Sequence, residues 1–167
     1  MAATQERSRC RGFAGLRSHR GSAALNAYFD TSAVVKLVVA EDGSDLADEL
    51  WDAAEQKIAS QLVYPEARAA LAAASRGGRL DPRALRRTVA DLDSAIAAMV
   101  LVGVDETLAR EAGRLAEEYG LRGYDAVHLA TALSGEDRKL VVVTWDRDLA
   151  GAAVRCGRAA APALPSE

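Results

Sequence analysis

Two carboxylates follow short apolar runs in this sequence, each with a hydroxyl group nearby. Asp30 ends the segment AYFD and has Ser32 two positions later, while Asp146 ends the segment VVVTWD, in which Thr144 precedes it. Aspartate is also a preferred residue at the start of a helix, so each motif alone has an ordinary structural explanation. The pair indicates two strand ends that carry the same kind of polar group.

Two further carboxylates lie where helices are expected to begin. Glu66 follows Pro65 in the segment VYPEARAAL, and Asp125 follows Gly123 in the segment LRGYDAVHLATAL. A carboxylate in the first turn of a helix is favourable near the positive end of the helix dipole, which is again a sufficient explanation for each one alone. Four separate structural explanations do not account for the recurrence of such acids on four elements, so we expect the four residues to share a function.

The elements that would position these acids follow an α/β pattern. Short apolar runs alternate with longer segments of helical period from residue 25 onward, which is typical of a single domain with a parallel sheet. The expected strands are residues 27–29, 57–59, 100–104 and 140–143. The expected helices are residues 32–40, 44–55, 64–75, 82–98, 106–119, 124–133 and 149–154.

Ligands of open parallel sheets bind outside the carboxyl ends of the strands, so this topology would bring the four acids together. Two like charges in close contact cost about 4 kcal/mol at an effective dielectric constant of 20. A divalent cation offsets that repulsion, and an all-oxygen site without Cys or His spacing favours Mg²⁺ or Mn²⁺ over zinc. Such an ion suits phosphoryl chemistry, because it lowers the pKa of water and neutralises phosphate charge.

The charge balance limits how the protein meets a polyanion. The 167-residue chain has a formal net charge of -3, but its first 26 residues hold five Arg and one Glu, so the remainder carries -7. An acidic domain has the wrong sign for tight unspecific binding to nucleic acid through counterion release. Recognition of a nucleic acid would therefore need local basic patches or bound cations.

Compartment and boundaries follow from simple patterns. Cys10 and Cys156 form neither a disulfide framework nor a zinc spacing, and the longest apolar run, residues 95–104, is about half of a membrane span, so we expect a soluble cytoplasmic protein. Residues 1–25 are expected to be a disordered arm or a mis-assigned start. Residues 26–155 are expected to form the domain, and 156–167 a C-terminal tail.

Four motifs, YFDTSAVVKL, VYPEARAAL, LRGYDAVHLA and LVVVTWDRDL, occur in this order between residues 26 and 155. The ordered set closely resembles the PIN-domain nucleases, in particular the VapC toxins of bacterial toxin–antitoxin pairs. The resemblance implies a single PIN-like domain with a parallel sheet of four to five strands and helices on both faces. It also implies a metal-dependent endoribonuclease in which Asp30, Glu66, Asp125 and Asp146 surround Mg²⁺ or Mn²⁺.

The resemblance further suggests roles and partners. Asp30 and Asp125 match the most direct metal ligands, and Ser32 and Thr144 match hydroxyl groups that orient ligands. Metal-activated water would attack the phosphodiester in line and leave a 5′-phosphate and a 3′-hydroxyl. Beyond an RNA substrate, the resemblance implies a homodimer and a VapB-type antitoxin whose C-terminal segment crosses the acidic site. Residues 1–25 have no counterpart in the family pattern.

Other residues have two competing interpretations. His128 lies one helical turn from Asp125, but the surrounding apolar pattern favours packing over a general-base role. Trp145 is expected to pack, with base stacking as the alternative. Arg79 and Arg83 belong to a basic run that is either a solvated face or an RNA contact. Asp148 is expected at a helix start, with a fifth site carboxylate as the alternative.

Competing functions are separated by specific residues. A phosphoacceptor receiver domain also has acids at strand ends, but the last strand here is followed by TWDR and no Lys. A dinucleotide-binding oxidoreductase is disfavoured because no G-x-G-x-x-G turn follows the first strand. A PIN-like module that binds RNA or protein without cleavage is the remaining alternative, although all four acids are present.

Overall fold

A five-stranded parallel sheet forms the centre of the molecule. The computed structural model describes residues 25–163, so the expectations for residues 1–24 and 164–167 lie outside the described part. The strand order is β3-β2-β1-β4-β5, and all four neighbouring pairs are parallel. The strands are β1 (Leu25–Phe29), β2 (Ala54–Ser60), β3 (Val100–Val102), β4 (Val141–Val143) and β5 (Ala159–Ala161).

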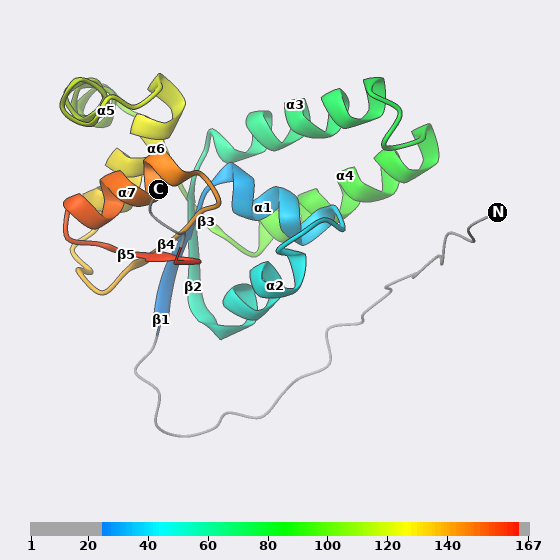
Figure 1. The fold of residues 1–167 in the computed structure, drawn as a ribbon, viewed down its shortest axis with the longest axis horizontal. Helices are drawn as coiled ribbons and strands as arrows, with labels where there is room; N and C mark the ends of the chain where they lie inside the picture. Colours follow the sequence, from blue (N-terminus) through cyan, green and yellow to red (C-terminus); the bar gives the residue numbers. More distant parts are fainter. Residues whose placement is uncertain (1–24, 164–167) are drawn as a thin grey trace.

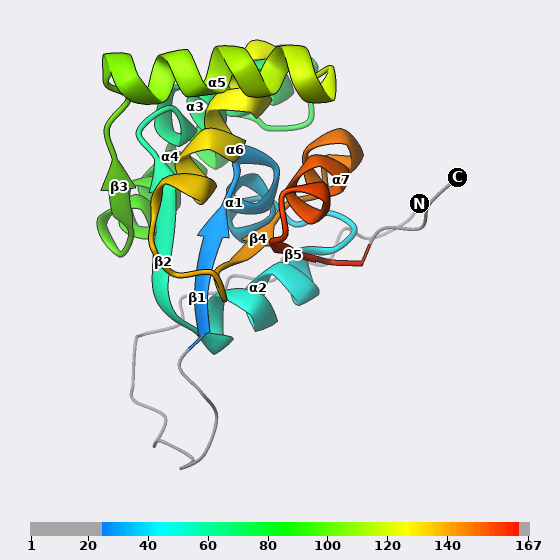
Figure 2. The same ribbon diagram turned by 90° about the vertical axis from the view of Figure 1, so that its left-hand side faces the viewer.

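Helices cover both faces of this sheet, as expected. Figure 1 shows α1 to α4 on one side and α5 to α7 on the other, and Figure 2 looks onto the layer of α5 to α7. In the described residues the helices are α1 (Thr31–Val38), α2 (Ser44–Ala53), α3 (Val63–Arg76), α4 (Pro82–Ala97), α5 (Glu106–Tyr119), α6 (Gly123–Ser134) and α7 (Arg147–Arg155). The prediction of one α/β domain with a parallel sheet is confirmed.

Strand β1 is buried on both faces because its side chains alternate between two cores. Tyr28 joins the apolar cluster beneath α5, α6 and α7, while Ala27 and Phe29 join the cluster beneath α1, α3 and α4. This division follows from the two-residue period of a strand. A strand covered on both sides has an apolar run in place of a polar alternation, which explains the sequence AYF.

Local signals set several helix boundaries. The Asp105 side chain accepts a hydrogen bond from the Leu108 amide (2.8 Å), and Gly120 ends α5 in the left-handed conformation at φ 68°. These two features reproduce the expected helix 106–119. The Asp30 and Asp146 side chains also cap α1 and α7, so the structural explanation of each as a helix N-cap is confirmed.

The C-terminal boundary differs from the expectation. Residues 159–161 form β5 and pair with β4, whereas residues 156–167 were expected to be a tail. Three consecutive alanines give little strand signal, because alanine is depleted in strands and pairing with β4 supplies the structure. No helix in the described range is both long and apolar enough to cross a membrane.

Candidate active site

The four acids singled out from the sequence all line one pocket. This pocket has a volume of about 380 Å³ and lies outside the carboxyl ends of β1 and β4. The chain runs outward from β1 to β3 on one side and returns to β4 on the other, so the pocket occupies the switch point where such sheets bind ligands. The fold therefore brings together Asp30, Glu66, Asp125 and Asp146.

Asp30 is fixed at the floor of the pocket by three donors. Its Oδ1 accepts from the Ser32 hydroxyl (2.7 Å) and the Ala33 amide (2.9 Å), and its Oδ2 accepts from the Thr144 hydroxyl (2.6 Å). The residue is only 4% exposed. Burial raises the pKa of Asp30 although all three hydrogen bonds act to lower it. The carboxylate thus has a defined orientation and a strong need for positive charge.

Ser32 and Thr144 connect the ends of the two central strands. Parallel pairing sets Phe29 opposite Val143, which places the next residues of both strands side by side. The Ser32 hydroxyl also accepts from the Trp145 amide (2.8 Å), and the Thr144 hydroxyl accepts from the Asp146 amide (3.0 Å). Both residues lie where the sequence interpretation places them, beside a candidate ligand.

Glu66 enters from the first turn of α3 and is held by two donors. Its Oε2 accepts from the Thr31 hydroxyl (2.6 Å) and lies 2.7 Å from Nε2 of His128. Partial burial acts to raise the pKa of Glu66, but the hydrogen bonds from His128 and Thr31 outweigh it and lower that pKa. His128 is packed in the core, as expected, at 2% exposure, yet it also contacts a site carboxylate, which the helical pattern did not indicate.

Arg122 joins the other two acids across the mouth of the pocket. Its Nε donates to Asp125 Oδ2 (2.8 Å) and its terminal nitrogen to Asp146 Oδ2 (3.1 Å). The hydrogen bond to Asp125 and the charges of both aspartates raise the pKa of Arg122. The guanidinium side chain is 79% exposed. The sequence interpretation missed this residue, although its position three residues before Asp125 was a usable signal.

The donor chemistry of the pocket fits a hard divalent cation. Its candidate ligands are carboxylate and hydroxyl oxygens, the donors that Mg²⁺ and Mn²⁺ prefer. In the described range, however, no three His, Cys, Asp or Glu side chains are close enough together to share one ion. In this arrangement Arg122 binds Asp125 and Asp146, while His128 contacts Glu66. Side-chain rotation and release of Arg122 would be needed to close the acids on an ion.

Asp148 takes the exposed helix-start position expected for it, whereas Trp145 both packs and lines the pocket, so base stacking by Trp145 stays a prediction. The Trp145 ring is partly buried, lines the pocket and has Lys36 Nζ 5.3 Å from a ring centroid. A Cβ on Gly43 would come within 2.7 Å of this ring, so Gly43 allows the close approach, with φ at 90°. Asp148 is exposed in the first turn of α7 and is absent from the pocket lining.

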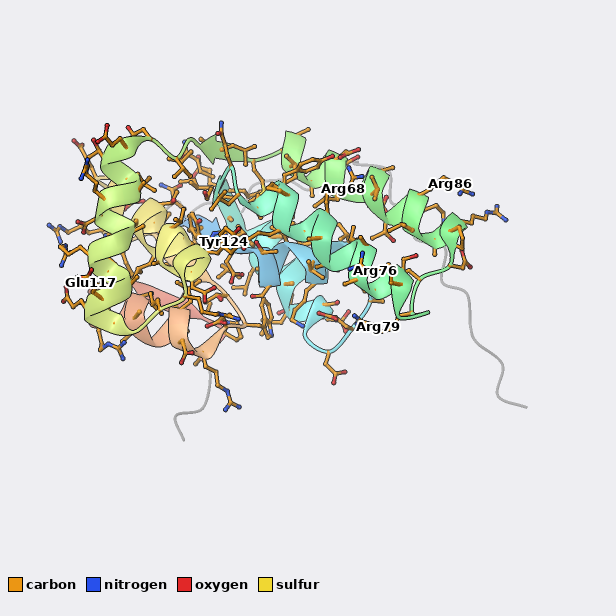
Figure 3. All side chains as sticks on the ribbon, turned by 90° about the horizontal axis from the view of Figure 1, so that it is seen from above. Arg68, Arg76, Arg79, Arg86, Glu117 and Tyr124 are labelled. Atoms are coloured by element: carbon orange, nitrogen blue, oxygen red, sulfur yellow. The ribbon has the colours of Figure 1, made fainter. Side chains whose placement is uncertain are left out.

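The basic residues expected to meet RNA lie outside the pocket. Arg79 follows the end of α3, and Arg83 is in the first turn of α4. Figure 3 shows Arg68, Arg76, Arg79 and Arg86 along the hairpin of α3 and α4, with Tyr124 nearer to α5. An RNA contact by Arg79 and Arg83 therefore stays a prediction.

This architecture and its acidic pocket define a nuclease-like α/β domain, and a family model identifies it. The model of the PIN domain matches residues 27–154, and the chain belongs to this family. It is 47% identical over 136 residues to ribonucleases VapC45 and VapC49 of Mycobacterium tuberculosis, covering 81% of this chain and 94% of theirs. Membership excludes the receiver and oxidoreductase alternatives.

Solved structures share the same fold. PAE2754 from Pyrobaculum aerophilum is 26% identical with a TM-score of 0.63, covering 84% of this chain and 87% of that chain. The sarcin–ricin-loop-cleaving toxin VapC20 of Mycobacterium tuberculosis is 17% identical with a TM-score of 0.59, covering 76% and 95%. A toxin–antitoxin complex from Klebsiella pneumoniae is 23% identical with a TM-score of 0.54, covering 75% and 92%.

Proposed function

We propose that this protein is a divalent-metal-dependent endoribonuclease and the toxin of a toxin–antitoxin pair. The observation that carries the proposal is the convergence of Asp30, Glu66, Asp125 and Asp146 on one pocket from four separate elements. The identity of 47% to proteins named as VapC ribonucleases supports the choice of reaction. The cytoplasm, where RNA is abundant, is the compartment that we propose.

The four acids are the residues that would hold Mg²⁺ or Mn²⁺, with Asp30 and Asp125 as the most direct ligands. When bound, the ion supplies a lowered pKa for water and positive charge for the phosphate. Asp30 contributes a carboxylate whose orientation is fixed by Ser32, Ala33 and Thr144. Glu66 or Asp146 would orient the water molecule or hold a second, weaker ion.

The reaction is hydrolysis of a phosphodiester without a covalent enzyme intermediate. The oxygen of water bonds to phosphorus, the bond from phosphorus to the 3′-oxygen breaks, and a proton from water ends on that oxygen. The products are a 5′-phosphate and a 3′-hydroxyl. Lys36 and Arg122 are the cationic side chains in the pocket lining and would contact the phosphate oxygens.

RNA outside the pocket would meet the hairpin of α3 and α4. Arg79 and Arg83 are exposed there in a domain that is otherwise acidic. Their positive charges would release counterions from the RNA backbone, so binding should weaken with salt. Alanine at both positions should weaken binding and flatten that salt dependence, whereas an unchanged slope would remove the hairpin from the binding surface.

A cognate VapB-type antitoxin is the protein partner that we propose, together with a homodimer. A toxin–antitoxin complex is among the structures that share this fold. The acidic pocket already accommodates one guanidinium, that of Arg122, between Asp125 and Asp146. An arginine-bearing antitoxin segment would supply the same charge from outside and block the site.

The reaction class is tested by the ends of the RNA fragments. Purified protein free of antitoxin is incubated with end-labelled RNA and Mg²⁺ or Mn²⁺, and the termini are identified. We expect 5′-phosphate and 3′-hydroxyl ends, whereas 2′,3′-cyclic phosphates would contradict hydrolysis by water. RNA binding without cleavage by well-folded protein would favour the alternative, a PIN-like module that binds RNA or protein without catalysis.

A further inference from the structure

A chain of hydrogen bonds runs through the core to one carboxylate of the pocket. The backbone amide of Ser60 in β2 donates to the Tyr28 hydroxyl oxygen in β1 (3.2 Å), which lies 2.7 Å from Nδ1 of His128 in α6. On the other side of the imidazole, Nε2 lies 2.7 Å from Glu66 Oε2 in α3. Four elements of the fold therefore meet in one polar chain.

The proton positions follow from the acceptor at the end of this chain. An ionised carboxylate has no proton to donate, so the 2.7 Å contact with Glu66 Oε2 requires a proton on Nε2 of His128. In the neutral ring Nδ1 is then an acceptor, and the Tyr28 hydroxyl, whose pKa is raised by burial, donates to it. The Tyr28 oxygen can still accept from the Ser60 amide. These contacts together favour the tautomer of His128 with its proton on Nε2.

Both hydrogen bonds to Glu66 fall on the same oxygen. His128 and Thr31 each contact Oε2, and Oε1 has no hydrogen-bond partner among residues 25–163. The carboxylate is therefore held on one side and open on the other. Glu66 lines the pocket with 24% of its side chain exposed, so the open oxygen is available for a ligand or a water molecule.

Packing alone does not account for this chain. Tyr28 and His128 are 0% and 2% exposed, and their neighbours in the core cluster include Leu129 and Leu149. Burying polar groups costs free energy that apolar residues of similar volume avoid, so a stable core does not require them. The polar chain instead ends at Glu66, an acid of the candidate active site. A hydrogen-bond donor there can orient the carboxylate and so affect how it binds a metal ion or water.

We propose that Tyr28 and His128 are positioning residues that fix the carboxylate of Glu66 in one orientation, with Oε1 presented to the pocket. This inference rests on the proposed ribonuclease function, because it assigns the support of one of its four acids. His128 borders the pocket but is only 2% exposed, so in this account it acts through Glu66, and Tyr28 acts through His128.

A set of three variants separates positioning from packing. His128→Leu keeps an apolar core and removes the donor, and we expect kcat to fall by about 10²-fold with KM within about threefold, since small misplacements of catalytic groups cost that much. His128→Gln places an amide nitrogen near the former Nε2 and should recover kcat to within about tenfold of wild type. Leu133→Ala weakens packing of the same helix without touching Glu66 and should leave kcat unchanged.

Contrary outcomes are equally specific. Failure of a folded His128→Gln protein to exceed His128→Leu, or an equal loss of kcat in Leu133→Ala, would overturn the proposal. If His128→Leu does not fold, His128→Asn keeps a polar partner for the Tyr28 hydroxyl near the former Nδ1 but is too short to reach Glu66. That variant should show the same loss of kcat, and full activity in it would overturn the proposal.

A spectroscopic measurement tests the relay without any cleavage assay. The chain has two histidines, His19 and His128, so a His19→Gln variant assigns the imidazole signals. Nitrogen-15 NMR of the metal-free protein should show a proton on Nε2 of His128, and an Nε2 without a proton would overturn the proposal. If wild type does not cleave RNA, the proposed function fails, while this measurement still decides whether the core orients Glu66.

Discussion

The two halves of the acidic pocket differ in what holds them. Asp30 and Glu66, the inner half, accept hydrogen bonds from backbone, hydroxyl and imidazole groups that are anchored in the fold. Asp125 and Asp146, the outer half, are no more exposed than Glu66, but the guanidinium of Arg122 that joins them is 79% exposed. Oδ1 of Asp146 also accepts from the Leu149 amide (2.9 Å), so the exposed arginine holds Asp125 and the other oxygen of Asp146.

The two halves therefore differ in function: the fold orients the inner carboxylates, and Arg122 compensates the negative charge of the outer ones. Donors anchored in the fold fix the inner carboxylates, and the burial of Asp30 leaves a need for positive charge. The exposed arginine compensates the outer pair, but exposed ion pairs contribute only about 0.2–1 kcal/mol and are screened by salt. The inner half is therefore preorganised, whereas the outer half can exchange its arginine for another cation. The exchange would complete a metal site.

The largest effect is expected from the inner half. Asp30→Asn keeps an acceptor for the Ala33 amide but removes the charge, so RNA cleavage should fall by more than about 10²-fold, since even residues that only support metal ligands cost about 10–100-fold. The measurement is kcat of the folded variant at saturating metal. Asp93→Asn, exposed on α4 and outside the pocket lining, is the matched control and should retain full activity.

Retention of activity in Asp30→Asn would remove the distinction between the halves. In that case the charge at the floor of the pocket would not take part in the reaction, and its burial would have only a structural role.

A smaller effect of opposite sign is expected from the outer half. Arg122→Ala removes the competitor for Asp125 and Asp146, so Mn²⁺ should bind about fivefold more tightly at low salt, which corresponds to about 1 kcal/mol. Calorimetry of the protein without RNA measures this. Arg110→Ala, which breaks an exposed pair with Glu106 on α5, should leave Mn²⁺ affinity unchanged. Weaker Mn²⁺ binding in Arg122→Ala would show that the arginine supports the site.

The smallest effects are expected in the pH dependence of folding stability, which should differ between variants of the two inner acids. The pKa of Asp30 is raised in the folded protein, so its ionisation destabilises the fold; the cost is absent below the unfolded pKa and grows as pH rises to the folded value. Asp30→Asn should therefore gain stability over wild type from pH 4 to pH 7. The pKa of Glu66 is lowered, so its ionised form stabilises the fold; this contribution is complete above the ordinary value of 4.5 and is lost as pH falls through the folded value. Glu66→Gln should therefore lose stability relative to wild type as pH rises from about 3 to about 5.

Urea unfolding of the metal-free proteins, at about pH 4 and 7 for Asp30→Asn and at about pH 3 and 5 for Glu66→Gln, measures both differences. Effects common to all three proteins cancel in each comparison with wild type. The same sign of change for the two variants would mean that burial and hydrogen bonding do not divide the inner acids as the structure indicates.

The sequence was sufficient where the signals are local. The grouping of the four acids in one pocket could be predicted because a strand end or a first helical turn is recognisable within a few residues. The ends of α5 could be predicted from Asp105 and Gly120 in the same way. The roles of His128 and Arg122 were not found, because they depend on contacts with Glu66 and Asp146 that lie 62 and 24 residues away. Strand β5 was missed for a similar reason, since only its pairing with β4 distinguishes it.

The central claim is that the acidic pocket is a metal-dependent ribonuclease site, and cleavage of total bacterial RNA tests it most directly. Wild type and Asp30→Asn, free of antitoxin, are each incubated with Mg²⁺ or Mn²⁺ and with EDTA. Wild type should cut only when the metal is present and should regain activity when metal is restored, while Asp30→Asn should leave the RNA intact. Cleavage that survives both EDTA and the substitution, or intact RNA with a folded wild-type protein that binds metal, would contradict the account.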